Sequence, residues 1–149
     1  MKRHASLRKF SDDHHGGLVQ ARRLRLAAAG EEDLLPEAAH AFLQFWEEDT
    51  SLHFREEEEV LLAVYAHCGG DLGAGPIQEM LADHARLRGL VLTLIDEDRL
   101  GKASVDTLRE IGERLEAHIR LEERRVFPLM ETTLPEECLE EIGARIATG

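Results

Sequence analysis

The chain has 149 residues, of which 43% are hydrophobic and 32% charged, a composition typical of one folded globular domain and not of a disordered segment. Its 30 Asp and Glu residues outnumber the 18 Lys and Arg residues, and the formal net charge is −12. Because nonspecific binding to nucleic acid or to an anionic membrane needs a basic surface, this charge argues against both partners.

Neither a signal peptide nor a membrane span is recognisable in the sequence. The basic N-terminus is not followed by an apolar core, and no apolar run approaches the length of a span. The two cysteines, Cys68 and Cys138, lie far apart and lack a paired-ligand spacing, so we expect two reduced thiols rather than a disulfide. These features predict a cytoplasmic protein.

The first predicted helix begins at Ser11 or Asp12, either of which would cap it, and ends at about Ala28, before Gly30. Gly16–Gly17 lies inside this helix, which is unfavourable unless another backbone or a ligand comes close.

The second predicted helix begins at Pro36 and ends near His67, before the turn-rich stretch from residue 68 to residue 76. Its inward-facing residues follow the three-and-four spacing of a helix buried along one side, and they are Ala39, Phe42, Leu43, Trp46, His53, Glu57, Val60, Leu61 and Val64. The third helix has the same pattern in Ile77, Met80, Leu81, His84, Leu87, Val91, Leu94 and Ile95.

Ser104 is the expected cap of the fourth helix, and Pro128 is expected to end or kink it. The apolar stripe of this helix is Val105, Leu108, Ile111, Leu115 and Leu129. A short helical segment with Leu139, Ile142 and Ile146 follows.

No strand-like alternation competes with these helices. Four long helices joined by short loops predict an all-α fold, an antiparallel up-down-up-down four-helix bundle with a short C-terminal helical segment. We expect a single domain over residues 1–149, with the bundle core at about residues 11–130 and a C-terminal appendage at residues 131–149.

Histidines and glutamates occupy core positions of this bundle. His118 and Glu122 stand on the apolar stripe of the fourth helix, and His53 and Glu57 repeat their spacing on the second. A buried imidazole or carboxylate needs a hydrogen-bond, ion-pair or metal partner, because burying it without one costs free energy. Counted from the helix ends at about 1.5 Å per residue, one histidine of each helix reaches nearly the same depth. The predicted metal ligands are His15, His53, Glu57, His84, His118 and Glu122, with His14 as an alternative or an addition to His15.

The ligand types favour iron, manganese or zinc over calcium, which is bound by oxygen atoms alone. Carboxylates one turn from histidines, on two different helices, can bridge two cations in one cavity. Two divalent cations would balance the buried charge of Glu57 and Glu122. We therefore expect two iron ions with a bridging oxo or hydroxo group, and manganese or zinc as alternative metals.

Four motifs carry a family resemblance: Asp13-His14-His15, His53-x-x-x-Glu57, His84, and H-x-x-x-E-E-x-x-x-F-P from His118 to Pro128. Over about residues 11–130 the chain resembles the hemerythrin-like (HHE cation-binding) domain. The resemblance implies a non-haem di-iron centre inside a four-helix bundle, which binds O2 or related small molecules reversibly. It also implies that the two glutamates bridge the irons and that the four histidines cap them.

The third helix departs from the oxygen-carrying members of that family, which place two histidines one turn apart there. Here Met80 and Arg88 flank His84 at those positions. A fifth imidazole is therefore missing, as in many bacterial relatives, and one iron is more open to external ligands. The candidates for the missing position are water, Glu56, Asp83 and His14.

His14 and His15 point about 100° apart on a helix and compete for one position. We favour His15, which matches the first histidine of the family better, over His14, which is backed by Phe10 and Leu18. The remaining histidines have no partner by this logic and are expected at the surface: His4, His40 and His67.

The favoured hypothesis is a small cytoplasmic di-iron protein that binds O2, NO or a peroxide as a carrier or sensor. The alternatives are a di-iron or di-manganese enzyme acting on peroxide or NO, an iron-sensing or iron-storage protein, and a metal-free helical interaction module. No accompanying DNA-binding or signalling module is recognisable. Any sensing output would therefore need a partner protein or the C-terminal segment, and a homodimer is compatible with the acidic exterior.

Overall fold

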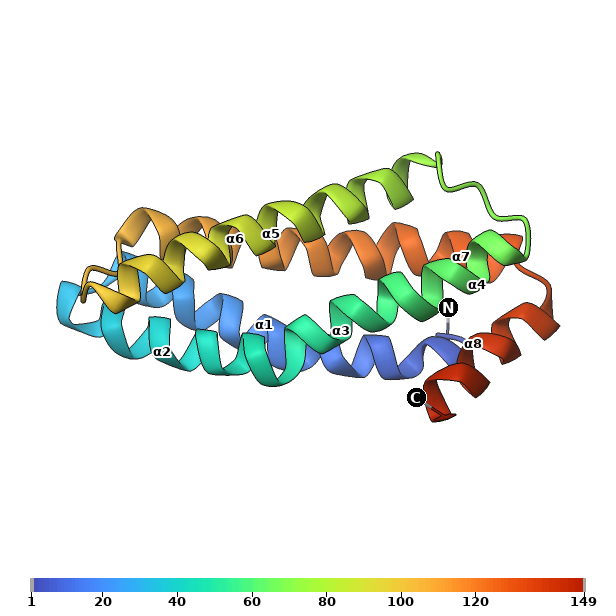
Figure 1. The fold of residues 1–149 in the computed structure, drawn as a ribbon, viewed down its shortest axis with the longest axis horizontal. Coiled ribbons are helices and arrows are strands. Elements are labelled where there is room, and N and C mark those ends of the chain that lie inside the picture. Colours follow the sequence, from blue (N-terminus) through green and yellow to red (C-terminus); the bar gives the residue numbers. More distant parts are fainter. Residues whose placement is uncertain (1, 149) are drawn as a thin grey trace.

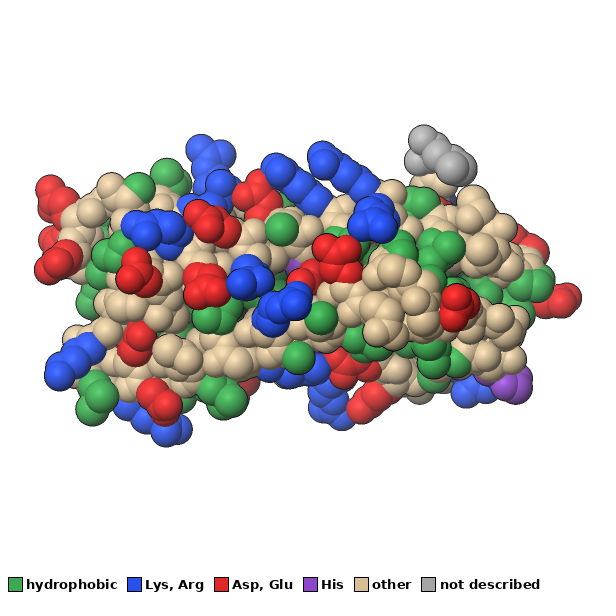
Figure 2. Space-filling model, turned by 90° about the horizontal axis from the view of Figure 1, so that it is seen from above, with side chains coloured by type: hydrophobic (Ala, Val, Ile, Leu, Met, Phe, Trp, Pro, Cys, Tyr) green, Lys and Arg blue, Asp and Glu red, His purple; other side chains and the backbone are tan. Residues whose placement is uncertain are grey.

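The computed structural model describes residues 2–148, which fold into helices and contain no β-strand. The long helical stretches form four continuous rods. These rods lie side by side along the long axis, and consecutive rods run in alternating directions (Figure 1). The predicted all-α bundle is confirmed. No helix within residues 2–148 is both long and apolar enough to cross a membrane. Acidic and basic side chains are interspersed over the face that Figure 2 shows.

The first rod begins earlier than the sequence predicted. A short 3₁₀ turn, η1 (Ala5–Leu7), leads into α1 (Arg8–Ala29). Phe10 is fully buried and extends the apolar face in front of the predicted start. The hydroxyl of Ser11 donates to the carboxylate of Glu123 on the fourth rod, 2.7 Å away, and does not cap a helix.

The second rod follows a 3₁₀ turn, η2 (Glu32–Leu34), and then continues without a break from residue 35 to residue 67, where it was predicted to end. Two π-helical segments, which have wider turns, interrupt its α-helix. The consecutive elements are α2 (Leu35–Phe45), the π segment η3 (Trp46–Thr50), α3 (Ser51–Glu56), the π segment η4 (Glu57–Leu61) and α4 (Leu62–His67).

The third rod is α5 (Gly75–Arg99), and the fourth consists of α6 (Val105–Leu121), the π segment η5 (Glu122–Val126) and α7 (Phe127–Thr133). Ser104 caps the fourth rod as predicted, because its hydroxyl accepts the backbone N–H of Thr107. Pro128 does not end this rod. It stands in the first turn after the π segment, a position in which proline is tolerated.

The apolar stripe of the fourth rod changes phase at Glu122, where the π segment begins. Beyond this point Val126 and Phe127 are fully buried. Leu129, which a regular helical period places in the core, is only partly buried. The π segment explains the difference, because its wider turn shifts the face on which later residues lie.

The C-terminal helix α8 (Glu136–Thr148) folds back beside the N-terminus and across the end of the second rod (Figure 1). Cys138 near its start is joined to Cys68 by a disulfide, with Cα atoms 6.5 Å apart. The expectation of two reduced thiols is therefore wrong, because spacing along the chain does not reveal that α8 returns to α4. Since disulfides persist mainly in oxidising compartments, the cytoplasmic location stays a prediction.

Two apolar clusters fill the bundle, one toward each end. The cluster beside α8 includes Phe10, Tyr65, Met80, Phe127 and Met130. The cluster beside the α1–α2 and α5–α6 connections includes Leu24, Phe42, Phe54, Leu94 and Ile111. Most of the buried polar side chains lie between the two clusters.

Helix α6 comes very close to α1 at Gly112. A Cβ atom at this position would lie 2.9 Å from the backbone oxygen of Ala21 and 2.8 Å from Cγ of Arg25. The first contact is with backbone and cannot be relieved by rotating a side chain. Gly89, on the exposed side of α5, has no atom within 4 Å of the equivalent position.

We expect Gly112→Ala to lower the free energy of unfolding by about 1–3 kcal/mol, the usual cost of overpacking. The matched change Gly89→Ala should raise it by about 0.5–1 kcal/mol, because alanine is the better helix former. Urea denaturation of both variants measures the two changes. A Gly112→Ala variant as stable as the wild type would contradict the close approach of the two helices.

Candidate metal centre

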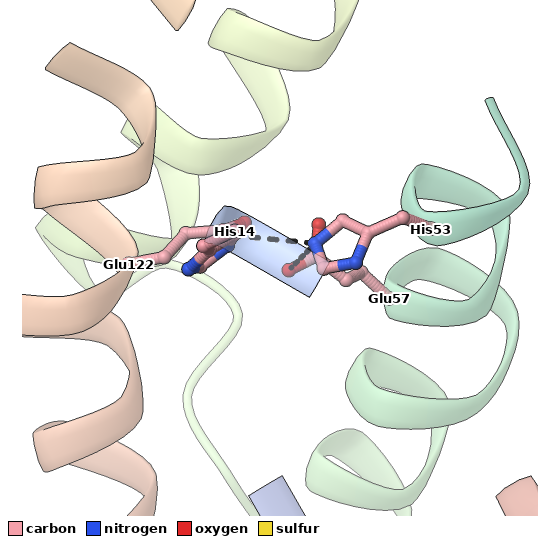
Figure 3. Close-up of side chains that lie close together, drawn as sticks. All are labelled: His14, His53, Glu57 and Glu122. Carbon is pink, nitrogen blue, oxygen red and sulfur yellow. Dashed lines mark hydrogen bonds and ion pairs between the residues drawn. The ribbon is translucent and has the colours of Figure 1, made fainter. Parts of the chain in front are cut away.

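Six buried polar side chains from all four rods meet between the apolar clusters. They are His14 from α1, His53 and Glu57 from the second rod, His84 from α5, and His118 and Glu122 from the fourth rod. Each is 6% exposed or less. Figure 3 shows four of them pointing toward one another from three different rods.

Glu57 lies between two histidines of different rods. Its Oε2 is 3.2 Å from Nε2 of His53, and its Oε1 is 3.1 Å from Nε2 of His84. Neither contact has the geometry of a hydrogen bond, so both carboxylate oxygens are buried without a hydrogen-bond partner.

Glu122 has the corresponding position on the fourth rod. Its Oε1 is 2.7 Å from Nε2 of His14, and its Oε2 is 3.0 Å from Nε2 of His118. The same carboxylate lies 3.7 Å from Nε2 of both His53 and His84. All four imidazoles therefore direct Nε2 toward the two glutamates.

The other ring nitrogen of each histidine, Nδ1, faces a carboxylate on the outer side. The pairs are His53 with Asp13 at 3.0 Å, His84 with Glu58 at 2.6 Å, His118 with Asp83 at 3.1 Å and His14 with Glu123 at 3.5 Å. Because a carboxylate can only accept, a neutral imidazole of His53, His84 or His118 carries its proton on Nδ1, and its inward Nε2 keeps a lone pair, as a metal ligand requires. His14 differs, because its hydrogen bond joins Nε2 to Glu122 and its Nδ1 has no hydrogen-bond partner.

The outer carboxylates form a closed ring around the bundle. Asp13, for example, precedes His14 in α1 but contacts His53 of the second rod. Glu58, Asp83 and Glu123 follow the same pattern. Each stands beside an inner residue in the sequence and contacts a histidine of the next rod. The ring closes because Glu123 of the fourth rod contacts His14 of the first. Sequence reasoning missed their role, although the Asp-His and Glu-Glu doublets at ligand positions are a visible signal.

The inner atoms of the cluster fit a metal cation. The buried atoms without a hydrogen-bond partner include Nε2 of His53, His84 and His118, both oxygens of Glu57 and Oε2 of Glu122. Leaving them unpaired is costly, and a bound cation would remove that cost. Two groups of four residues have ligand atoms within 4.8 Å of one another: His14, His53, Glu57 and Glu122, and Glu57, His84, His118 and Glu122. Both glutamates belong to both groups.

Aromatic rings that sequence reasoning did not assign to the site enclose the histidines. Phe54 stacks on His84, with ring centroids 3.9 Å apart and planes 10° apart. Phe127 lies nearly parallel to His14, with centroids 5.7 Å apart. The position of Phe54 directly after His53 in the sequence was a signal that this ring could lie beside the site. Phe127 could not be assigned to the core from a regular helical period, because the phase of the fourth rod changes at Glu122.

The preference for His15 over His14 is wrong. His14 is buried and contacts Glu122, whereas His15 is exposed. The reason is the early start of α1, which places Phe10 in the core one turn before His14. His15 points about 100° away from that face.

His14 takes the place expected of His15, so the cluster holds four imidazoles and the fifth is still missing. The two carboxylates considered for that position contact different groups. Glu56 pairs with Lys9, 2.6 Å away, near the surface, and Asp83 contacts the outer nitrogen of His118. Each group of four therefore contains two histidines.

The remaining histidines lie outside the cluster. His40 and His67 are exposed, as expected. His4 is only partly buried at the N-terminal end, where its ring contacts Ser6 and Glu136.

The electrostatics of the cluster favour positive charge. Burial alone would lower the pKa of His118, but the charge of Glu122 and the hydrogen bond with Asp83 raise it to about 10. Burial would also lower the pKa of His84, but Glu122 and Glu57 outweigh this effect and raise the pKa to about 9. Burial would raise the pKa of Glu122, but His118 and the other imidazoles hold it well below its usual value. The carboxylates thus attract a cation, either a proton or a metal ion.

A cavity of about 260 Å³ connects the cluster with the surface between α1 and the second rod. Its inner wall includes His14, His53, His118 and Glu122, and its exposed rim includes Lys9, Asp12, Asp13, Glu48 and Asp49. Glu57 and His84 are not part of the wall, so the group that contains His84 lies deeper.

The family model described as Hemerythrin HHE cation binding domain matches residues 6–130, which include all six inner residues. The chain belongs to this family. No curated protein and no solved structure matches the chain. Cation binding by a hemerythrin domain agrees with a buried cluster of carboxylates and imidazoles in which six inner atoms, on His53, Glu57, His84, His118 and Glu122, lack hydrogen-bond partners.

Stability of the metal-free hemerythrin domain should fall as the pH rises from about 6.5 to about 10. An unfolded histidine has a pKa of about 6.5, whereas His84 and His118 have pKa values of about 9 and about 10 in the folded chain. In this range the folded state holds protons that the unfolded state has lost, so raising the pH favours unfolding. Denaturant titrations with a chelator present measure the change. A stability that rises over this range would contradict the raised pKa values.

Asp83→Asn should weaken metal binding about tenfold or more, because it removes the charge that holds the imidazole of His118 from outside. Asp96→Asn, a matched change at a 76% exposed side chain on the same helix, should leave the affinity unchanged. Competition with a chromophoric chelator measures both affinities. Equal affinities of the two variants would show that the outer carboxylate does not support the site.

Proposed function

We propose that this hemerythrin domain holds two iron ions between its four rods. The ligands are His14 and His53 on one ion, His84 and His118 on the other, and Glu57 and Glu122 shared between them. The observation that carries the proposal is the fully buried pair of glutamates, whose oxygens belong to both groups of four. Imidazole with carboxylate suits iron, and manganese and zinc are the alternative metals.

Iron bound at these residues would supply a redox-active centre with coordination positions left for O2, NO or a peroxide. The chain controls what reaches it. The cavity opens on the side of His14 and His53, whereas Phe54 covers the face of His84 and keeps bulk water from that side. The outer carboxylates hold each imidazole with Nε2 inward. These features support a binding site for a small ligand.

We favour reversible binding, in the role of a carrier or sensor, because this is what the family resemblance implies. The second candidate is an enzyme with two iron or manganese ions that acts on peroxide or NO. The missing imidazole on α5, where Met80 and Arg88 flank His84, favours this candidate, because it leaves one iron more open to an external substrate. Consumption of the ligand by the metal-loaded protein separates turnover from stoichiometric binding.

Anaerobic reconstitution with Fe(II) should load two ions per chain, counted by elemental analysis after unbound metal is removed. The Glu122→Gln variant should bind at least one ion fewer, because the substitution removes a carboxylate charge that belongs to both groups of four residues. Metal that binds only the folded chain should also raise the melting temperature, by mass action.

The matched control is Glu59→Gln, a change of the same kind at an exposed side chain of the second rod, which should load two ions like the wild type. Circular dichroism establishes that both variants remain helical. A wild-type protein that retains no metal would refute the proposal.

A further inference from the structure

The mouth of the cavity beside His53 is strongly acidic. Five carboxylates line it together with a single basic side chain, Lys9; they are Asp12, Asp13, Glu48, Asp49 and Glu56. Lys9 pairs with Asp13 and Glu56, at 2.9 and 2.6 Å. Within residues 2–148, Asp12 and Asp49 make no ion pair or side-chain hydrogen bond, and Glu48 accepts only from the amide of Gln44, 3.3 Å away. Three carboxylates of the mouth thus keep an uncompensated charge.

The inner end of the same cavity presents atoms that suit a cation. Nε2 of His53, Nε2 of His118 and Oε2 of Glu122 are all without a hydrogen-bond partner. These residues are 6%, 1% and 0% exposed, and all three belong to the cavity wall. One passage therefore joins an acidic mouth to unpaired buried ligand atoms.

Local backbone structure shapes the wall of this passage. Gly16 lies in the wall and lets the ring of Phe45 on the facing rod pack closely, because a Cβ atom there would come within 2.9 Å of that ring. The π segment η3 carries Glu48 and Asp49 to the rim. Elsewhere apolar packing closes the site, because Phe54 stacks on His84 and the two apolar clusters fill the bundle on either side.

We propose that the acidic-mouthed cavity between α1 and the second rod is the route by which divalent metal cations reach the centre. The inference rests on the proposed metal-binding function and adds how the site is loaded. A cleft lined by one sign of charge focuses the electric field and accelerates association of the opposite charge by about 10-fold to 1,000-fold. The His14–His53 side fills first, because it faces the cavity, and the deeper group fills from it.

The test is the rate of uptake of Co²⁺ alone, followed by its visible absorption after rapid mixing at low ionic strength. The variant with Asp12→Asn, Glu48→Gln and Asp49→Asn should take up the metal about tenfold more slowly, with the same final stoichiometry. Lys9→Gln should take it up faster, because it removes the one positive charge of the mouth. Both differences should shrink at high salt, where exposed charges are screened.

The matched control carries the same change in net charge at the far end of the bundle, as Glu31→Gln, Glu32→Gln and Asp33→Asn, and should bind Co²⁺ at the wild-type rate. If the mouth variant and this control load at equal rates, the route is wrong while metal binding stands. If the wild type takes up no Co²⁺ or Fe²⁺ at equilibrium, the metal-binding function fails, and the route fails with it.

Discussion

The structure depends on how a helical bundle accommodates two fully buried carboxylates. A carboxylate taken out of water without compensating charge is among the most unfavourable groups a core can hold. Here Glu57 and Glu122 face imidazoles from all four rods, and three of their four carboxylate oxygens have no hydrogen-bond partner. The centre is therefore not an addition to a finished core. The rods are held in place partly by groups that are stable only when positive charge lies between them.

The ring of outer carboxylates extends this constraint to the arrangement of the rods. Each outer contact joins two neighbouring rods, so rotating one rod about its axis would break a contact on either side. Apolar packing alone would tolerate such rotations more easily, since hydrophobic contacts are not directional. The ring also fixes which nitrogen of each imidazole points inward. Orientation of the imidazoles and alignment of the helices therefore have the same physical origin.

Much of this was predictable, because the information is local. Helical periodicity identified four rods, and polar residues on apolar stripes identified His53, Glu57, His84, His118 and Glu122 as core residues. The choice between His14 and His15 failed because it followed the family motif, whereas burial follows Phe10, which lies in the core one turn before His14 in a helix that begins earlier than predicted. The disulfide could not be foreseen, because it depends on the direction in which α8 folds back. Contacts between rods, such as the stacking of Phe54 on His84, likewise require the packed bundle.

Two of the three π segments described above, η4 and η5, begin at the two buried glutamates. Buried residues recur at intervals of four on both rods that carry a glutamate, as His53, Glu57, Leu61 and Tyr65, and as His118, Glu122, Val126 and Met130. In a regular α-helix each step of four residues rotates the side chain by about 40°, so three steps would carry it well out of the core. A wider π turn offsets this rotation, and one begins at each glutamate. The π turns therefore allow an unbroken helix to keep a histidine, a glutamate and the apolar residues that follow on one face. A run of buried-type residues at a spacing of four is thus itself a sign of such a turn.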